Sequence, residues 1–491
     1  PEDADDEEGP YRVQSHSEKV PSAKNRILIF LILLAMLLPA GAQASLSAIV
    51  GPRFLLIRGW KPLLAPWPDH PAMQKLRKTF VGLWHGILLL LAAQVLLLLC
   101  QLVRSFLAND PLTLTLSSHL RLLGKQGFYG TFLILTLILA ARRFHEHWLR
   151  LFTWQARGIL IASVLLGLYM LGQRFWGWDW IHGFQAKIGE HRFAYGVYRA
   201  SGLMGHPLTL AYNCMLLALV SFAQGLWSLQ REPRQGWTWL MISVVNLGLI
   251  GLTGSRYPLA VTAVLMMMAA LIHISHTTRH TMLGLGVLAV LIISAIFLLD
   301  PVMMGRVREL MDPTLPLEER FDRWIFWKVH LIIFMDHPWL GTGLANYDRL
   351  LLDYYDQAGY THIERKYTAH HILLQTLADS GLFGSLALLV IFVVLFRAAF
   401  RLWKDFRHQG FLLIALGTLL GGLMQNTLRD SEYLYALWTS MGLCCGCLMS
   451  GGVPDESNGR SHLQDHQSGE DFADRRAHVR RQDAGVDSHQ G

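Results

Sequence analysis

The chain has 491 residues, of which 52% are hydrophobic and only 16% charged, and its formal net charge is +7. Soluble domains carry charge on about a quarter of their residues, so this composition excludes an ordinary soluble protein and indicates a polytopic membrane protein. The positive charge lies largely in short loops rather than in a basic soluble domain, so no nucleic acid is expected as a partner. All five cysteines fall in apolar runs, which predicts neither a disulfide framework nor a zinc site.

In chain order, an acidic tail over 1–25 and a polar tail over 452–491 are both typical of disorder. Apolar runs long enough to form membrane helices lie between the tails. The runs are 27–47, 79–101, 127–141, 157–173, 206–226, 237–252, 256–273, 281–299, 382–398, 410–427 and 433–450. The predicted fold class is therefore all-α, with about 11–12 transmembrane helices in one domain over 26–451.

Short connections rich in arginine and lysine set the predicted orientation, because such connections stay in the cytoplasm. The basic connections are 142–157, 231–234, the loop around Arg279, and 397–407. The segments that alternate with them, and are therefore predicted to face outward, are 174–205, 253–256, 300–369 and 428–432. The longest of these, 300–369, is predicted to be a large and partly helical outer loop.

The topology of the first apolar run has two solutions. The basic segment 48–78 is predicted to be cytoplasmic, which leaves the N-terminus outside if 27–47 is a single span. A bent pair of spans over 27–57, around Pro39 and Gly41, instead gives twelve spans and places both tails inside. A cleavable signal peptide is disfavoured, because its removal would place the basic segment 48–78 outside.

Three motifs with an arginine lie at the outer ends of predicted helices. Arg199 precedes Ser201-Gly-Leu-Met-Gly-His-Pro207, where an outer segment enters a span. Ser255 is expected to cap the next helix, whose unpaired N–H groups favour an anion beside Arg256. Arg323 begins an amphipathic helical pattern that breaks at His337-Pro338, and its planar guanidinium suits phosphate. One such arginine more often anchors a helix at lipid headgroups, whereas two of them on one side fit anion binding and lipid anchoring about equally well.

Two histidines, His370 and His371, lie just before the apolar run 382–398. At about 100° per residue, the eleven steps from His370 to Gly381 return to the same helix face, and Gly384 lies close to that face. Small residues on one face predict a tightly packed helix seam with a histidine at its outer end. Tyrosines precede the histidines, including Tyr367, and fit either a sugar-binding cleft or an interfacial aromatic belt.

In this order and spacing, the motifs resemble the O-antigen ligase and O-antigen polymerase family of bacterial envelope proteins. The resemblance covers roughly residues 190–400. It rests on Arg199 with Ser201-Gly202, on Thr253-Gly-Ser-Arg256, on Arg323-x-x-x-Trp327 with His337-Pro-Trp-Leu-Gly-Thr-Gly343, and on His370 with Gly381 and Gly384. The family usually has Asn or a small polar residue after the functional histidine, and this chain has His371 there. The spacing to Gly381 favours His370 as the functional residue.

The resemblance implies a glycosyltransferase of the bacterial inner membrane that works at the periplasmic face, with membrane lipids around it and without a metal or other cofactor. Its donor would be a glycan linked to undecaprenyl diphosphate, and its acceptor a sugar hydroxyl of lipid A–core. A single displacement would invert the anomeric centre. The implied site has His370 as the catalytic base and Arg199, Arg256 and Arg323 on the diphosphate. Further possible substrate contacts are His371, Ser255, His337 and Tyr367.

Other functions stay open at this point. An O-antigen polymerase of the same superfamily is the runner-up, and an oligosaccharyltransferase that modifies protein comes third. A transporter or flippase of lipid-linked sugars is disfavoured, because the predicted spans are nearly free of charge and show no internal repeat. A non-catalytic scaffold would not account for arginines and a histidine gathered at outer helix ends.

Overall fold

The structure is a computed structural model that describes residues 148–182, 193–194, 197–229, 232–274, 301–364, 366–402, 409–427 and 430–450, with a few single positions elsewhere. Both predicted tails lie outside the described residues. The predicted spans 27–47, 127–141 and 281–299, and most of 79–101, also lie wholly or almost wholly outside them, together with the alternative topologies of 27–57.

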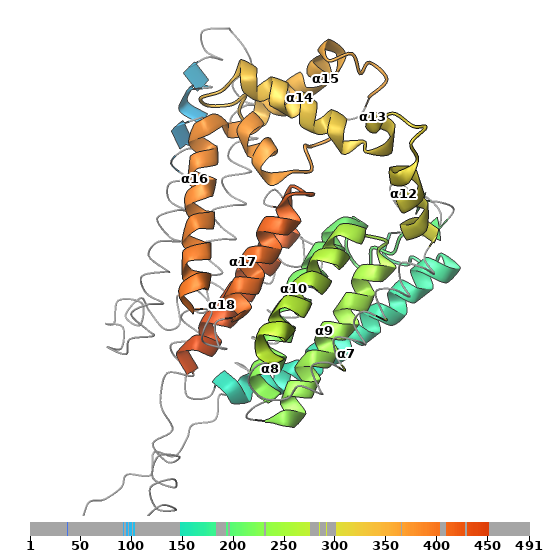
Figure 1. The fold of residues 1–491 in the computed structure, drawn as a ribbon, viewed down its shortest axis with the longest axis vertical. Coiled ribbons are helices and arrows are strands. Elements are labelled where there is room, and N and C mark those ends of the chain that lie inside the picture. Colours follow the sequence, from blue (N-terminus) through green and yellow to red (C-terminus); the bar gives the residue numbers. More distant parts are fainter. Residues whose placement is uncertain are drawn as a thin grey trace, which may run out of the picture.

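The described part of the chain is almost entirely helical, which confirms the predicted all-α class (Figure 1). The helices are α7 (Trp148–Trp176), α8 (Pro207–Leu229), α9 (Pro233–Leu252), α10 (Arg256–Ile274), α12 (Pro301–Met311), α13 (Leu317–Arg320), α14 (Arg323–Asp336), α15 (Leu344–Gln357), α16 (Ile372–Leu402), α17 (Gln409–Gly422) and α18 (Ser431–Ser450). Between α7 and α8, the short strands β1 (Phe193–Ala194) and β2 (Val197–Tyr198) pair antiparallel.

Four of the described helices are long and apolar enough to cross a membrane, which supports a polytopic membrane protein. They cover Gln155–Trp176, Pro207–Leu229, Pro233–Leu252 and Ile372–Val394, with shorter apolar helices over Arg256–Ile272 and Gln409–Gly422. These agree with the predicted runs except at two ends. The run 410–427 stops being helical at Gly422, and the run that was predicted to begin at 382 belongs to a helix that begins at Ile372.

Helix α8 is the centre of the bundle. It is almost completely buried and packs against α9, α10, α17 and α18. In lipid the hydrophobic effect does not drive helices together, so membrane helices associate through close packing at small residues and through polar contacts. A Cβ on Gly225 would lie 2.8 Å from the side chain of Leu240, and one on Gly417 would lie 2.7 Å from Leu219. The hydroxyl of Ser243 also donates a hydrogen bond to the carbonyl of Ala218 at 2.9 Å.

Helices α13, α14 and α15 lie across one end of the bundle, and the prediction that the segment 300–369 is partly helical is confirmed (Figure 1). The amphipathic pattern that begins at Arg323 forms α14 and ends, as predicted, at His337. Its apolar face packs on α16 and joins a small core with α15. The buried side chains of that core are Ile325, Phe326, Val329, Ile333, Tyr347, Leu351, Tyr354, Tyr355, Tyr360 and Ala378.

Helix α16 is broken at Gly381, where φ is 60° and ψ is −157°. Only glycine adopts this region readily, and the break leaves backbone groups without partners inside the helix. The segment 338–343, between α14 and α15, supplies those partners. The N–H groups of Thr342 and Gly343 donate to the carbonyls of Ala378 and Asp379 at 2.9 Å each. In return, the N–H groups of Leu382 and Phe383 donate to the carbonyls of Pro338 and Trp339 at 2.8 Å and 3.3 Å.

The predicted seam from His370 to Gly381 and Gly384 is therefore wrong. His370 precedes the helix, and Gly381 interrupts it, so the three residues do not share one helix face. Gly381 is required instead by the inserted backbone, because a Cβ there would lie 2.4 Å from the carbonyl carbon of Trp339. At Gly384 a Cβ would meet the Cβ of Ser380, in the same broken helix.

Gly341→Ala is expected to destabilise the protein more than Gly359→Ala. Both residues have positive φ, of 67° and 87°, so alanine at either costs about 1–2 kcal/mol of backbone strain. At Gly341 a Cβ would also lie 2.4 Å from the carbonyl carbon of Asp379, whereas nothing lies within 4 Å at Gly359. Overpacking of this kind adds roughly 1–3 kcal/mol. Thermal unfolding of the detergent-solubilised variants measures the difference, and equal losses would contradict a tight insertion at the break.

Candidate active site

The turn between α9 and α10 is held by Arg199. Its Nε donates to the carbonyl of Thr253 at 3.0 Å, and its Nη2 donates to the hydroxyl of Ser255 at 3.3 Å. The last carbonyls of a helix have no partner within the helix and carry partial negative charge, so a cation is favourable there. The predicted motifs of Arg199 and of Ser255-Arg256 therefore lie together, and the hydroxyl of Ser255 accepts a hydrogen bond from Arg199.

A second arginine at the same helix end was missed from the sequence. The buried side chain of Arg174, in the last turn of α7, donates from Nη1 to the carbonyl of Leu252 at 3.2 Å. It also donates to the carbonyl of Tyr198 at 3.4 Å, next to Arg199. Arg174 lies at the end of an apolar run, where an arginine is usually expected to reach the lipid headgroups. Only the packing of α7 against α9 shows that its charge points inward.

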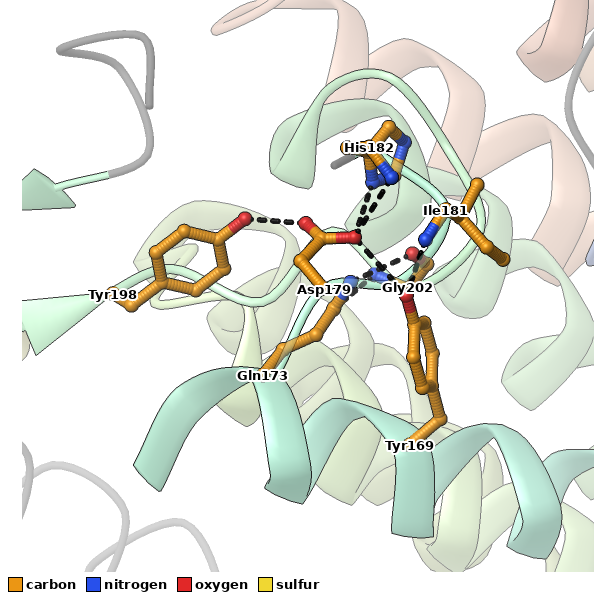
Figure 2. A network of polar contacts seen from close by, with 7 residues as sticks. All are labelled: Tyr169, Gln173, Asp179, Ile181, His182, Tyr198 and Gly202. Atoms are coloured by element: carbon orange, nitrogen blue, oxygen red, sulfur yellow. Dashed lines mark hydrogen bonds and ion pairs between the residues drawn. The ribbon is translucent and has the colours of Figure 1, made fainter. Parts of the chain in front are cut away.

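Figure 2 shows the polar network that fixes the chain before α8. The carboxylate of buried Asp179 accepts hydrogen bonds from Tyr169 at 3.0 Å, from Tyr198 at 2.5 Å and from the His182 ring at 2.8 Å. Burial on its own would raise the pKa of Asp179, but the hydrogen bonds from Tyr198 and His182 outweigh it and hold the pKa below the usual range. This network was also missed, because Tyr169, Asp179 and Tyr198 follow no helical or strand periodicity.

The neighbouring pair of Gln173 and Gly202 completes that network. The side-chain amide of Gln173 donates to the carbonyl of Gly202 at 3.0 Å and accepts from its N–H at 2.8 Å. Gly202 has φ of 57°, and a Cβ there would lie 2.9 Å from Leu210. The glycine predicted beside Arg199 is thus needed for a close turn, and the backbone on both sides of Arg199 is fixed.

Arg256 and Arg323 each begin a helix near that turn. Arg256 is the first residue of α10 and is half-buried, and the hydroxyl of the next residue, Tyr257, donates to the carbonyl of Leu420 at 2.8 Å. Arg323 is the first residue of α14, and its positive charge acts on Tyr257 and on His370. The motif that begins with Arg323 therefore lies close enough for its charge to act on the motifs of Arg256 and His370.

His370 lies directly before the turn that starts α16. Its φ is 48°, in the left-handed region that is uncommon for residues other than glycine. Its Nδ1 is 2.6 Å from the side-chain oxygen of Gln425, and its ring centroid is 5.8 Å from that of Phe326. Burial, together with the charge of Arg323, lowers the pKa of His370, whereas the hydrogen bond to Gln425 acts in the opposite direction. The ring is therefore mainly neutral at pH 7.

Gln425 is a further residue that sequence reasoning missed. It follows the end of α17 in a turn that closes with hydrogen bonds from Leu423 N–H to Leu420 at 3.1 Å and from Met424 N–H to Gly421 at 3.2 Å. Hydropathy placed Gln425 inside the predicted span 410–427, where a polar side chain would be a packing residue. Its adjacency to Asn426 is the one sequence signal that the span ends earlier.

His371 has a structural role at the start of α16. Its Nδ1 accepts a hydrogen bond from the N–H of Leu374 at 3.4 Å, which is the contact made by an N-cap residue. Its ring meets Trp327 edge-on at 5.5 Å, and burial lowers its pKa. Asn, which the resemblance leads one to expect at this position, is among the best N-cap residues. His371 thus replaces one capping side chain by another.

The remaining candidates, His337 and Tyr367, lie around the α14–α15 connection. His337 ends α14, and its Nε2 is 3.3 Å from the hydroxyl of Tyr354. Tyr367 stacks on Phe326 at a centroid distance of 4.9 Å, so it lies on the same aromatic ring that contacts His370. Tyr367 therefore belongs to the immediate surroundings of His370. Within the described residues, no group of three or more His, Cys, Asp or Glu side chains gathers as a metal site.

Residues 240–389 match a family model described as O-antigen ligase. This segment is therefore similar to the O-antigen ligase family, which supports the resemblance seen in the sequence. It runs from α9 into α16 and includes Arg256, Arg323 and His370, whereas Arg199 and Gln425 lie outside it. A search of the curated proteins found no match. The family match and the long apolar helices together support a multi-pass membrane protein that resembles glycosyltransferases acting on lipid-linked glycans.

His371→Asn is expected to keep the stability of the wild-type protein, whereas His371→Ala is expected to lose about 1 kcal/mol, because Asn can cap α16 and Ala cannot. Thermal unfolding in detergent measures both. A loss from His371→Asn as large as that from His371→Ala would contradict the capping role.

Proposed function

We propose that this protein is an O-antigen ligase. It transfers a glycan from undecaprenyl diphosphate to a sugar hydroxyl of lipid A–core at the periplasmic face of the inner membrane. The observation that carries the proposal is the placement of His370, whose ring contacts Gln425 and lies within reach of the charge of Arg323 at the ends of membrane helices. The family match of residues 240–389 supports the same reaction class.

The reaction needs a base for the acceptor and positive charge for the leaving group. The acceptor hydroxyl oxygen attacks the anomeric carbon while its proton passes to the imidazole of His370. The bond from that carbon to the diphosphate oxygen breaks, and its electron pair leaves with the diphosphate. This single displacement inverts the anomeric centre.

Arg256 and Arg323 supply the positive charge in this proposal. Fixed cations at the site of developing charge stabilise the transition state without reorganisation. The first turn of α10 adds unpaired N–H groups and the positive end of the helix dipole beside Arg256. Arg199 contributes through the turn 253–255, which it holds by two hydrogen bonds and which presents Arg256.

The acceptor distinguishes the ligase from the runner-up. A polymerase of the same superfamily would use a second lipid-linked glycan as acceptor with the same donor chemistry. Deletion of the gene separates the two, because the products differ on a gel of envelope glycans. Full-length chains left on the carrier lipid with bare lipid A–core indicate a ligase. Core that carries a single repeat unit indicates a polymerase.

His370→Ala and Arg256→Ala are each expected to lower glycan transfer at least about a hundredfold, because one removes the base and the other a cation on the leaving group. The deletion strain complemented with each variant, at matched membrane levels, gives the measurement. Arg234→Ala is the control, since Arg234 is an exposed arginine at the other end of α9. Transfer at the wild-type rate by His370→Ala would overturn the proposal.

The pH dependence of transfer follows from the protonation of His370. The base acts in its neutral form, and burial with the charge of Arg323 holds its pKa below the usual 6.5. Protonation on the acid side removes the base, so the rate is expected to stay constant between about pH 7 and 8 and to fall only under more acidic conditions. Initial rates in membranes, with donor and acceptor extracted from the deletion strain, test this. A rate that declines from pH 6 to pH 8 would contradict it.

A further inference from the structure

We propose that Gln425 is the positioning residue of this site, and that it fixes the tautomer and the orientation in which His370 accepts a proton. The proposal rests on the transferase function above. It adds a residue from outside the segment that matches the family, on the turn between the last two described helices.

The contact itself defines the tautomer. The side-chain oxygen of Gln425 lies 2.6 Å from Nδ1 of His370. An amide oxygen only accepts hydrogen bonds, so Nδ1 carries the proton. In the neutral ring, Nε2 then holds the lone pair and is the atom that takes the acceptor proton. A ring in the other tautomer would present an N–H at Nε2 and could not accept a proton at that atom.

The position of Gln425 is set by the end of α17. The carbonyl of Leu420 accepts from the hydroxyl of Tyr257, and that of Gly421 accepts from Tyr212 at 3.0 Å. These two tyrosines come from α10 and α8, so the turn that bears Gln425 is tied to the central bundle. A Cβ on Gly422 would lie 3.1 Å from Ile372, the first residue of α16. The end of α17 and the start of α16 therefore lie in direct contact.

The backbone of His370 is held independently of its ring. The residue is in the left-handed region, which costs a non-glycine residue of order 1–3 kcal/mol and persists where the surroundings determine it. The N–H of the preceding residue, Ala369, donates to the side chain of buried Gln375 at 2.9 Å. Gln375 fixes the backbone and Gln425 fixes the ring, so the direction of Nε2 is determined.

The neutral amide suits this environment. Among the described residues, Arg323 on α14 is the charged group that acts on His370, while His371 follows it and Tyr367 lies across Phe326. The described carboxylate nearest to Gln425 along the chain is that of Asp430, which accepts a hydrogen bond from Thr209 and caps α18. The carboxylate of Asp379, on α16 beyond His370, accepts from Gln375 at 3.0 Å. A carboxylate at position 425 would stabilise the protonated ring, whereas an amide orients the ring without adding charge.

Gln425→Leu and Gln425→Glu test the proposal in opposite ways. Gln425→Leu removes the acceptor of the Nδ1 proton, so either tautomer of His370 can form. The variant is expected to lower the transfer rate at least about tenfold, with little change in KM for the donor. Gln425→Glu keeps the acceptor but adds a charge, and is expected to move the acid limb of the pH–rate profile up by about one unit. Gln409→Leu is the matched control, since Gln409 is a buried glutamine at the other end of α17. It is expected to keep the wild-type profile.

A readout that needs no transfer separates the contact from the function. Carbethoxylation by diethyl pyrocarbonate modifies only the unprotonated ring, so its rate against pH reports the titration of His370. A His371→Asn background leaves His370 as the only histidine between Lys366 and Arg397, and mass spectrometry of that tryptic peptide isolates it. Gln425→Glu is expected to shift the midpoint upward by about one unit. Because this variant is nearly isosteric, it also gives a result if Gln425→Leu does not fold.

The outcomes are distinct. If His370→Ala is inactive while Gln425→Leu transfers at the wild-type rate with an unchanged pH profile, the positioning role is overturned and the transferase function stands. An unchanged carbethoxylation midpoint in Gln425→Glu overturns the contact itself. Activity of His370→Ala at the wild-type rate overturns both proposals together.

Discussion

Four backbone hydrogen bonds join the break in α16 to the segment 338–343, and the placement of the site depends on them. An unpaired backbone group in an apolar environment costs several kcal/mol, so a break inside a membrane helix persists only where other groups replace the lost partners. The inserted segment does so on both sides of Gly381. Because it connects α14 with α15, the same bonds fix α14 over the bundle. Phe326 then lies against His370, and the charge of Arg323 reaches the histidine.

The site is assembled from helix ends, and each end is satisfied by a group from another part of the chain. The last carbonyls of α9 receive Arg174 and Arg199, and those of α17 receive the hydroxyls of two tyrosines. The first turn of α16 receives His371. Cations and tyrosine hydroxyls thus gather where helix ends would otherwise leave carbonyls without partners. A boundary between membrane and water needs such groups for stability, and the same groups suit a charged, lipid-linked substrate.

The sequence was sufficient for features that depend on local pattern. The apolar runs of the described helices, the amphipathic helix from Arg323 and its end at His337 follow from periodicity and breaker residues. It failed where contacts are non-local. The helix face from His370 to Gly381 assumed a continuous helix, and nothing near Gly381 reveals the inserted segment. Gln425 was hidden because average hydropathy extends a span through a polar residue that follows an apolar run. Arg174 is recognisable only from the packing of α7 on α9, and Asp179 only from its contacts with Tyr169 and Tyr198.

The choice of an amide beside the histidine follows from the leaving group. A carboxylate would orient the ring equally well and would strengthen it as a base, but it would also attract Arg323 and Arg256. In the proposed reaction those arginines bind a diphosphate, and a fixed negative charge among them would offset part of their attraction for it. The amide of Gln425 orients Nδ1 and leaves the positive charge for the substrate. The lower basicity of His370 is consistent with this arrangement, because the proton is taken only as the acceptor oxygen attacks, and a neutral ring is present at pH 7 without a carboxylate partner.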